Sequence, residues 1–179
     1  MAEDKTAPRS RPDLHALNAF PRAAFVQYLA TIWEDSAWVA DRTWDHRPFD
    51  NLAALHKCMT DTVQVAGKTA QLALLRAHPD LAGKLTRGGG LTAHSTEEQA
   101  GLGLDRLEET EFAWFDRHNA AYRARFGFPF IIAVKENTRD GIRHALATRL
   151  DNDPAVEMKT ALGEVAKIAK FRLEGLFGT

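Results

Sequence analysis

Apolar residues recur at helical spacing along most of the chain, and only the first residues lack this pattern. Phe25, Leu29 and Ile32 stand at positions i, i+4 and i+7 of one stripe, which predicts an amphipathic helix. Residues 1–13 mix proline, arginine, aspartate and serine without any apolar period. We therefore expect a disordered tail over residues 1–13 and a single folded domain over residues 14–179.

Three more helices are indicated before residue 80. A short helix follows Ser36, and a long amphipathic helix ends at Gly67, a typical helix-terminating residue. The next helix stops at His78, because Pro79 disfavours helical geometry in the residue before it. The apolar stripe of the long helix consists of Leu52, Leu55, Met59, Val63 and Ala66.

A glycine-rich segment then separates the two halves of the chain. Residues 80–95 read DLAGKLTRGGGLTAHS, and long loops of this kind inside a compact domain are often functional. We expect a helix to resume at Ser95 and to run to Gly127. Its apolar stripe comprises Leu102, Leu107, Trp114, Phe115 and Tyr122.

The last third of the chain begins with the apolar run FPFIIAV at residues 128–134. This run is too short for a surface helix and predicts a buried extended stretch, either a lone strand or an irregular crossing. Thr138 and Asp153, the latter followed by Pro154, are then expected to open two further helices. Together these elements predict an all-α, single-domain bundle of roughly seven to nine helices.

Composition narrows the class of protein without naming an activity. The 179 residues carry 23 Lys and Arg against 24 Asp and Glu, a formal net charge of −1, so non-specific binding to nucleic acid is not expected. No apolar run reaches the roughly 18 residues of a membrane span. One cysteine permits neither an internal disulfide nor a thiolate zinc site, and the first residues lack the apolar core of a signal peptide. We therefore expect a cytoplasmic protein.

The seven histidines do not form a helical metal-binding pattern. No pair stands at HxxxH or HExxH spacing, so no metal site is predicted, although one assembled from distant residues stays possible. They are His15, His46, His56, His78, His94, His118 and His144.

His78 differs from the other histidines in its setting. It ends a helix, precedes Pro79 and faces the glycine-rich loop, so the backbone fixes its position. Such a residue suits a general acid or base near neutral pH. A helix-terminal histidine that interacts with the helix dipole would explain the same local sequence.

The segment Ser95-Thr96-Glu97-Glu98-Gln99 also has two readings. Ser95 and Glu98 have capping-box spacing, in which each side chain binds the backbone amide near the other. A helix N-terminus with free N–H groups can equally bind an oxyanion or a carboxylate. The two readings are compatible, with the cap fixing the backbone and Glu98 or Gln99 facing a ligand.

Three other features have simpler explanations. Cys58 lies on an apolar helix face and is expected to be a buried, inert thiol. The four tryptophans stand among apolar positions and are expected in or near the core. Arg172 interrupts an apolar stretch between Phe171 and Leu173, so its side chain could point inward to bind an anion.

Three long motifs resemble one family, the decarboxylases of 2-oxo-4-hydroxy-4-carboxy-5-ureidoimidazoline (OHCU). The motifs are HPDLAG at residues 78–83, STEEQAGLGLDRL at 95–107 and FGFPFIIAVK at 126–135. The later KIAKFRLEGL is similar to the closing helix of the family, and the resemblance spans residues 17–177. It implies an all-α, cofactor-independent enzyme, a homodimer, that converts OHCU to (S)-allantoin during urate degradation.

The resemblance also assigns residues. His78 matches the catalytic histidine, Glu98 its catalytic partner, and Pro79 a substrate-contacting proline. Arg172 falls near an arginine that meets a substrate carboxylate. The segment that lines the site comprises Ser95, Thr96, Glu97 and Gln99, and the substrate-binding backbone stretch comprises Phe130, Ile131, Ile132, Ala133 and Val134.

The implied chemistry agrees with the absence of a cofactor motif. OHCU carries a C=N bond next to the carboxylated carbon, so the substrate can accept the electron pair that CO₂ leaves behind. Three alternatives stay open: a metal-free lyase acting on a related ureido acid, a non-catalytic helical binding module, and a metallohydrolase. Activity on a panel of related substrates would identify the first, ligand binding without turnover the second, and loss of activity after chelation the third.

Overall fold

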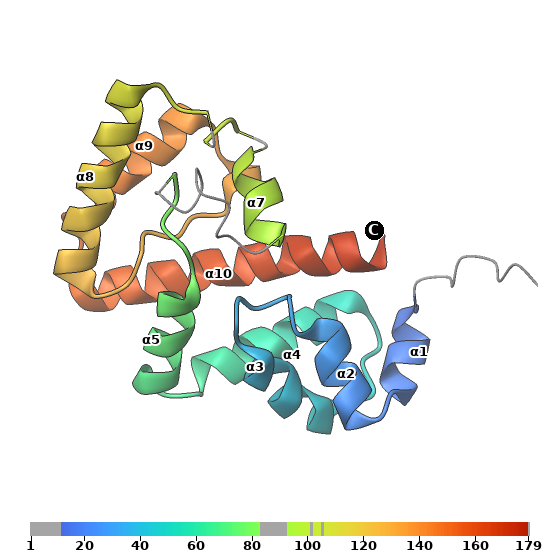
Figure 1. Cartoon of the computed structure of the whole chain (residues 1–179). Coiled ribbons are helices and arrows are strands. Elements are labelled where there is room, and N and C mark those ends of the chain that lie inside the picture. Colours follow the sequence, from blue (N-terminus) through green and yellow to red (C-terminus); the bar gives the residue numbers. More distant parts are fainter. Residues whose placement is uncertain (1–11, 83–92, 101, 105, 179) are drawn as a thin grey trace, which may run out of the picture.

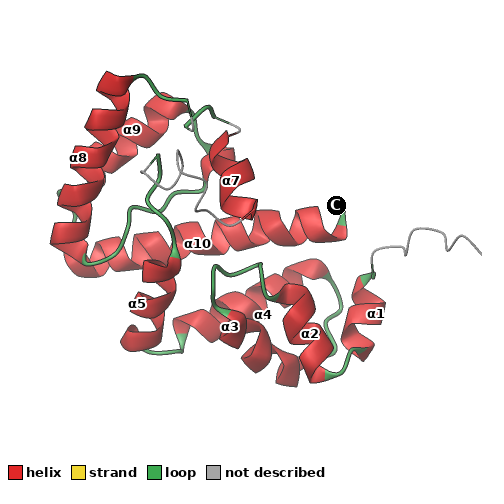
Figure 2. Ribbon diagram, viewed as in Figure 1, coloured by secondary structure: helices red, strands yellow, loops and turns green. Residues whose placement is uncertain are grey.

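The structure, a computed structural model, describes residues 12–82, 93–100, 102–104 and 106–178. These residues form helices and connecting loops and contain no strand, so the predicted all-α class is confirmed (Figure 2). Most of the expected tail, residues 1–11, lies outside the described residues, and Asp13 caps the first helix by accepting a hydrogen bond from the Ala16 amide. The elements are α1 (Leu14–Ala19), α2 (Arg22–Leu29), α3 (Ala37–Thr43), η1 (Trp44–His46), α4 (Leu52–Gln64), α5 (Lys68–Ala77), α7 (Ala93–Ala100), α8 (Glu109–Phe126), η2 (Val134–Glu136), α9 (Arg139–Arg149) and α10 (Pro154–Phe177).

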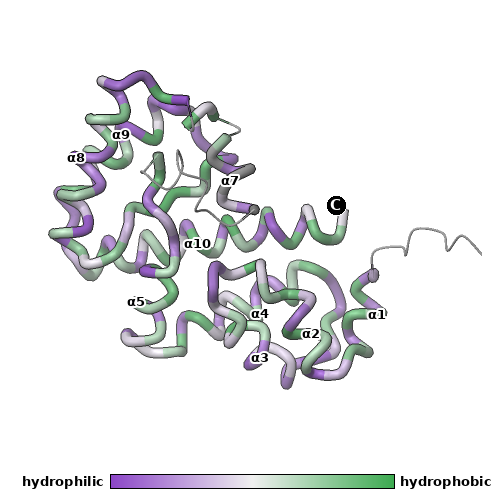
Figure 3. The backbone as a smooth tube through the Cα atoms, in the orientation of Figure 1, coloured by the Kyte–Doolittle hydropathy of each residue, from purple (hydrophilic) through white to green (hydrophobic). Residues whose placement is uncertain are grey.

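The long helix α10 is the centre of the arrangement. It separates the group formed by α1 to α4 from the group formed by α7, α8 and α9 (Figure 1). It packs against α4 of the first group, against α8 of the second group, and against α5, which lies between the two groups in the sequence. Hydrophobic and hydrophilic positions alternate along it (Figure 3), as expected for a helix that contacts neighbours on more than one face. A residue on α10 can therefore meet side chains from both groups.

Several predicted helix boundaries are confirmed because their capping residues act locally. Thr138 accepts a hydrogen bond from the Gly141 amide and opens α9. Asp153 accepts from the amides at the start of α10, whose first residue is Pro154. Gly127 ends α8 with φ of 76°, a left-handed conformation that glycine adopts without strain.

The helix expected from Ser95 to Gly127 is wrong as a single element. The structure has two helices here: α7 starts at Ala93 and ends at Ala100, and α8 starts at Glu109. Gly103 lies between them with φ of 66°, which interrupts the helix. The expectation for the Gly88–Gly90 loop concerns residues outside those the structure describes.

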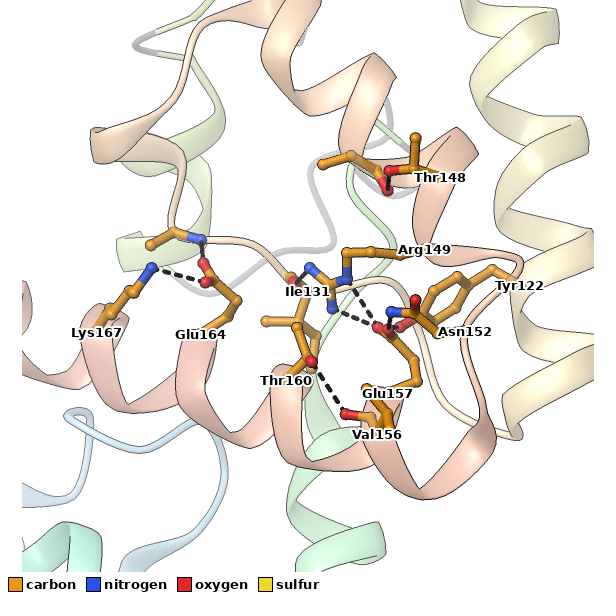
Figure 4. A network of polar contacts seen from close by, with 12 residues as sticks. Tyr122, Ile131, Thr148, Arg149, Asn152, Val156, Glu157, Thr160, Glu164 and Lys167 are labelled. Carbon is orange, nitrogen blue, oxygen red and sulfur yellow. Dashed lines mark hydrogen bonds and ion pairs between the residues drawn. The ribbon is translucent and has the colours of Figure 1, made fainter.

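The apolar run at residues 128–134 is confirmed as a buried irregular crossing between α8 and α9. Two side chains from the following helices hold its backbone. The Arg149 guanidinium donates a 2.9 Å hydrogen bond to the carbonyl oxygen of Ile131, and the amide of Ala133 donates a 2.8 Å bond to Glu164 (Figure 4). These bonds replace the strand pairing that the segment lacks.

A buried carboxylate underlies this crossing. Glu157 is fully buried and accepts hydrogen bonds from Arg149, Asn152 and Tyr122 (Figure 4). Burial, and then the hydrogen bond to Glu157, raise the pKa of Tyr122, so its hydroxyl keeps its proton and acts as a donor. Because Arg149 binds both Glu157 and Ile131, the network fixes the position of the crossing segment.

The expectations for the tryptophans are confirmed, and that for the cysteine needs a correction. Trp33 is buried, and Trp38, Trp44 and Trp114 are partly buried against the core. Cys58 is half-buried rather than buried, and its burial raises the pKa of the thiol, which disfavours the reactive thiolate. Within the described ranges, no helix has the length and apolar character needed to cross a membrane.

Candidate active site

His78 occupies the position at which α5 ends. It is the C-terminal capping residue, with the extended geometry that the following Pro79 favours. Its side chain is buried, and Nδ1 lies 3.0 Å from the carbonyl oxygen of Leu74. A carbonyl oxygen only accepts, so Nδ1 carries the hydrogen and Nε2 has a free lone pair. Nε2 is buried and has no hydrogen-bond partner among the described residues.

The surroundings keep His78 uncharged. Burial lowers the pKa of the imidazole most strongly, and the positive charge of Arg172 lowers it further. The contact with Leu74 and the negative charges of Glu34 and Glu98 act in the opposite direction but do not outweigh burial. A neutral histidine with an unpartnered nitrogen is suited to receive a proton.

Arg172 on α10 confirms the prediction of an inward-pointing cation. Its Nε and one terminal nitrogen donate to the two oxygens of Glu98, each over 3.0 Å. Its other terminal nitrogen donates to Glu34 over 2.8 Å. Burial alone would lower the pKa of the guanidinium, but the hydrogen bonds and charges of Glu98 and Glu34 raise it. The anions that Arg172 binds here are thus two carboxylates of the same chain.

The capping-box interpretation of Ser95 and Glu98 is wrong. Helix α7 begins at Ala93, so Ser95 is already inside the helix. Its buried hydroxyl donates to the Glu34 carboxylate over 3.2 Å, while Glu98 binds Arg172. The spacing of three places both side chains on one face of α7, and that face points to α10 and the loop before α3.

Glu34 belongs to this cluster and was not predicted from the sequence. It lies in the loop between α2 and α3 and is buried. The sequence contains one indication that Glu34 is buried. Glu34 directly follows the apolar pair Ile32-Trp33, and Arg172 similarly interrupts an apolar stretch of α10. Two opposite charges, each next to apolar residues in the sequence, are expected to pair when both are buried.

A small cavity of about 40 Å³ lies at the centre of these residues. Most of the predicted site residues line it, which brings together positions from four parts of the sequence. Its described lining consists of His78, Pro79, Leu81, Ser95, Glu98, Phe130, Ile131, Ile132, Val134, Ile168 and Arg172.

The other four predicted site residues are not among the described residues that line this cavity. One of them, Ala133, donates a hydrogen bond from its backbone amide to Glu164. Thr96, Glu97 and Gln99 lie in α7, but their side chains are outside what the structure describes.

A second cavity of about 520 Å³ adjoins the first. Glu98, Val134 and Arg172 line both, so the Arg172–Glu98 pair forms part of the wall between the two spaces. His94, Lys135 and other residues surround the larger space. The small cavity holds about three water-sized groups, since a single water needs about 10–15 Å³. A larger molecule that contacts His78 therefore has to extend into the adjoining space as well.

Two further observations delimit the site. Another cavity, about 990 Å³, lies elsewhere, along α4, α5 and α10, and none of the predicted site residues is among its described lining. Among the residues that the structure describes, no group of three His, Cys, Asp or Glu side chains is placed to hold a metal ion.

Comparison with known proteins gives consistent results. The family described as OHCU decarboxylase matches residues 18–174. A 2-oxo-4-hydroxy-4-carboxy-5-ureidoimidazoline decarboxylase from Halalkalicoccus jeotgali is 44% identical over 167 residues, which cover 93% of each chain. The protein of the same description from Haloferax volcanii is 41% identical over 93% of this chain and 96% of its own.

Solved structures with this fold are also similar. A crystal structure of (S)-allantoin synthase superimposes with a TM-score of 0.76 and 30% identity, over 94% of this chain and 55% of that chain. An OHCU decarboxylase crystallised in the presence of (S)-allantoin has a TM-score of 0.68 over 85% of this chain and 99% of its own. At 24% identity, the second likeness concerns the fold alone.

Proposed function

The chain belongs to the OHCU decarboxylase family, and we propose that His78, Glu98 and Arg172 are the side chains that carry its reaction. The protein is a carboxy-lyase that converts OHCU to (S)-allantoin in urate degradation. One observation carries the assignment of residues: a buried, unpartnered nitrogen of His78 lines the same cavity as the Arg172–Glu98 pair.

The reaction needs little beyond positioning and proton transfer. When the bond from C4 to the carboxylate breaks, its electron pair forms a C4=C5 double bond, and the electrons of the adjacent C=N bond move to nitrogen. That nitrogen takes up the proton that decarboxylation of a carboxylate consumes. The resulting enol then loses its hydroxyl proton and gains a proton at C5, which gives allantoin.

His78 is the residue best suited to this last proton transfer. Its Nε2 lone pair can take the proton from the enol hydroxyl and return it to the neighbouring carbon. Because the imidazole is fixed by Leu74 and by the end of α5, it would deliver the proton to one face of the ring only. Delivery from one side accounts for a single enantiomer.

Arg172 and Glu98 supply the contacts to the reacting carbon. We propose that the substrate carboxylate takes the place of the Glu98 carboxylate on the guanidinium of Arg172, which offers two parallel donors. Glu98 then becomes free to accept a hydrogen bond from the 4-hydroxyl group. The exchange also removes a contact from the wall between the two cavities and makes room for the substrate.

The crossing segment offers backbone groups for the ureido and amide parts of OHCU. Ile131 and Ala133 use backbone groups to bind Arg149 and Glu164, respectively. In an extended chain, the backbone N–H and C=O groups of adjacent residues point to opposite sides. The N–H and C=O of Ile132 would therefore face the cavity, which the Ile132 side chain also lines. The resemblance to the family supports further contacts from Pro79, Ser95, Thr96, Glu97, Gln99, Phe130 and Val134.

We also propose an oligomeric state and a cellular location for the protein. The resemblance to the family supports a homodimer, which light scattering coupled to size-exclusion chromatography would test. A single cysteine and the absence of a disulfide framework favour a cytoplasmic location. Fractionation of the source cells would test the location.

The test of the proposed function uses substrate made in place. Urate oxidase and hydroxyisourate hydrolase generate OHCU, and the appearance of optical activity reports formation of (S)-allantoin. We expect the protein to produce one enantiomer rapidly, before and after exhaustive chelation, and to leave a panel of other ureido acids unchanged. Slow, racemic product at the spontaneous rate, or binding of OHCU without turnover, would contradict the proposal.

A further inference from the structure

We propose that Glu34 is a positioning residue of this enzyme: it anchors one edge of Arg172 so that the opposite edge can exchange Glu98 for the substrate carboxylate. This inference rests on the proposed role of Arg172 in binding that carboxylate. Glu34 contacts the substrate only through Arg172, so it orients the guanidinium and does not itself touch the reacting atoms.

The geometry divides the guanidinium of Arg172 into two edges. One terminal nitrogen donates to Glu34 over 2.8 Å and to the carbonyl oxygen of Thr31 over 3.3 Å. Both acceptors belong to the loop between α2 and α3. The other edge, formed by Nε and the second terminal nitrogen, binds Glu98 with the parallel geometry that carboxylates prefer, and that nitrogen also lies 3.5 Å from the Ser95 hydroxyl oxygen.

Burial distinguishes the anchor from the exchangeable partner. The Glu34 side chain is 2% exposed, whereas that of Glu98 is 16% exposed. Glu98 lines both cavities of the site, and Glu34 is not among the described residues that line either. A substrate carboxylate entering from the larger cavity therefore meets the edge that Glu98 occupies.

Glu34 is itself held in place by a third element. The Ser95 hydroxyl on α7 donates to its carboxylate over 3.2 Å. Glu34 thus connects the α2–α3 loop with α7 and α10, the two helices that carry Glu98 and Arg172. Without it, Arg172 would have the side-chain freedom of a long flexible residue, and its binding edge would lose a fixed direction.

The chemistry predicts which kinetic constant responds. The negative charge that Arg172 binds moves from the carboxylate into the ring as neutral CO₂ departs, so the interaction is stronger in the bound substrate than in the transition state. Loss of such an interaction weakens substrate binding and leaves the chemical step largely intact. We expect Glu34 substitutions to raise KM by about tenfold or more, the effect of one charge-assisted hydrogen bond. We expect kcat to change by less than about threefold.

A second readout separates positioning from a purely structural role. The groups that act on His78 are Glu34, Glu98 and Arg172, and the negative charge of Glu34 raises the pKa of the imidazole against the effect of burial. Removing that charge in Glu34→Gln should lower the pKa further and move the acid limb of kcat to lower pH. Glu34→Asp keeps the charge, so its acid limb should stay near that of the wild type while its KM rises.

The experiment compares Glu34→Gln and Glu34→Asp with Asp35→Asn in the full chain, with OHCU generated in place. Asp35 is the exposed neighbour of Glu34, and asparagine tolerates its positive φ of 40°, so this control should keep wild-type kinetics. A raised KM in both Glu34 variants, with the shifted acid limb in Glu34→Gln, supports the inference. Wild-type KM and pH profile in both variants, with only a lower unfolding temperature, would overturn it.

Substitution of Arg172 separates this inference from the proposed function. If Arg172→Lys raises KM and the Glu34 variants do not, only the role of Glu34 fails. If Arg172→Lys also leaves KM unchanged, the proposed substrate contact fails and the inference fails with it.

Discussion

Arg172 and Glu98 lie 74 residues apart in sequence and are joined by two parallel hydrogen bonds, each 3.0 Å long. The pair connects α10 to α7 and forms part of the wall between the two cavities of the site. A guanidinium that binds one carboxylate in this way is also prepared to bind another. The pair therefore indicates how an anionic substrate can be bound, by exchange with Glu98 on the guanidinium.

We predict that Arg172→Lys raises KM for OHCU by about tenfold or more and changes kcat little, because lysine cannot form two parallel hydrogen bonds. Steady-state kinetics with OHCU generated in place will measure both constants. Arg22→Lys is the matched control, since Arg22 binds Asp41 in the same bidentate manner on the surface, remote from the cavities. An unchanged KM in Arg172→Lys, or an equal increase in Arg22→Lys, would contradict the assignment.

The pH dependence of kcat follows from the environment of His78. Burial lowers the pKa of its imidazole below the usual value of about 6.5, so the neutral, proton-accepting form persists to lower pH. Activity should therefore be retained as the pH falls through 6.5 and be lost only when it falls through the lowered pKa. A profile of kcat against pH measures this directly. An acid limb at or above pH 6.5 would show that a neutral His78 is not the group required.

The buried pair beneath the crossing segment is predicted to matter for stability. Arg149→Met would leave the Glu157 carboxylate buried without its cation, and such a loss costs about 3–5 kcal/mol of the free energy of unfolding. Urea unfolding will measure the change. The control is Arg117→Met on the exposed face of α8, where the free energy should change by no more than about 0.5 kcal/mol. Equal stability of the two variants would argue against the network.

The sequence predicted the parts of the fold that local signals determine. Thr138, Asp153 and Gly127 mark helix ends because their own conformations and hydrogen bonds act within a few residues. The irregular crossing at residues 128–134 was also predictable, because an apolar run with few polar groups must be buried.

The sequence was less informative where distant residues decide the outcome. Ser95 and Glu98 have the spacing of a capping box, yet their partners are Glu34 and Arg172, which only the tertiary fold brings to α7. The same spacing describes a helix start and one face of a helix, and local sequence does not distinguish them. Glu34 was missed for the related reason that its partners are 61 and 138 residues away.

The most direct test of the account compares two histidine substitutions in the assay for optical activity. His78 and His118 each contact the carbonyl oxygen four residues earlier, but only His78 lines the cavity. We predict that His78→Gln slows formation of (S)-allantoin by about 10²- to 10⁴-fold, the usual contribution of a general acid or base, while His118→Gln retains wild-type activity. If folded His78→Gln forms (S)-allantoin at the wild-type rate, the central claim that His78 transfers the proton is wrong.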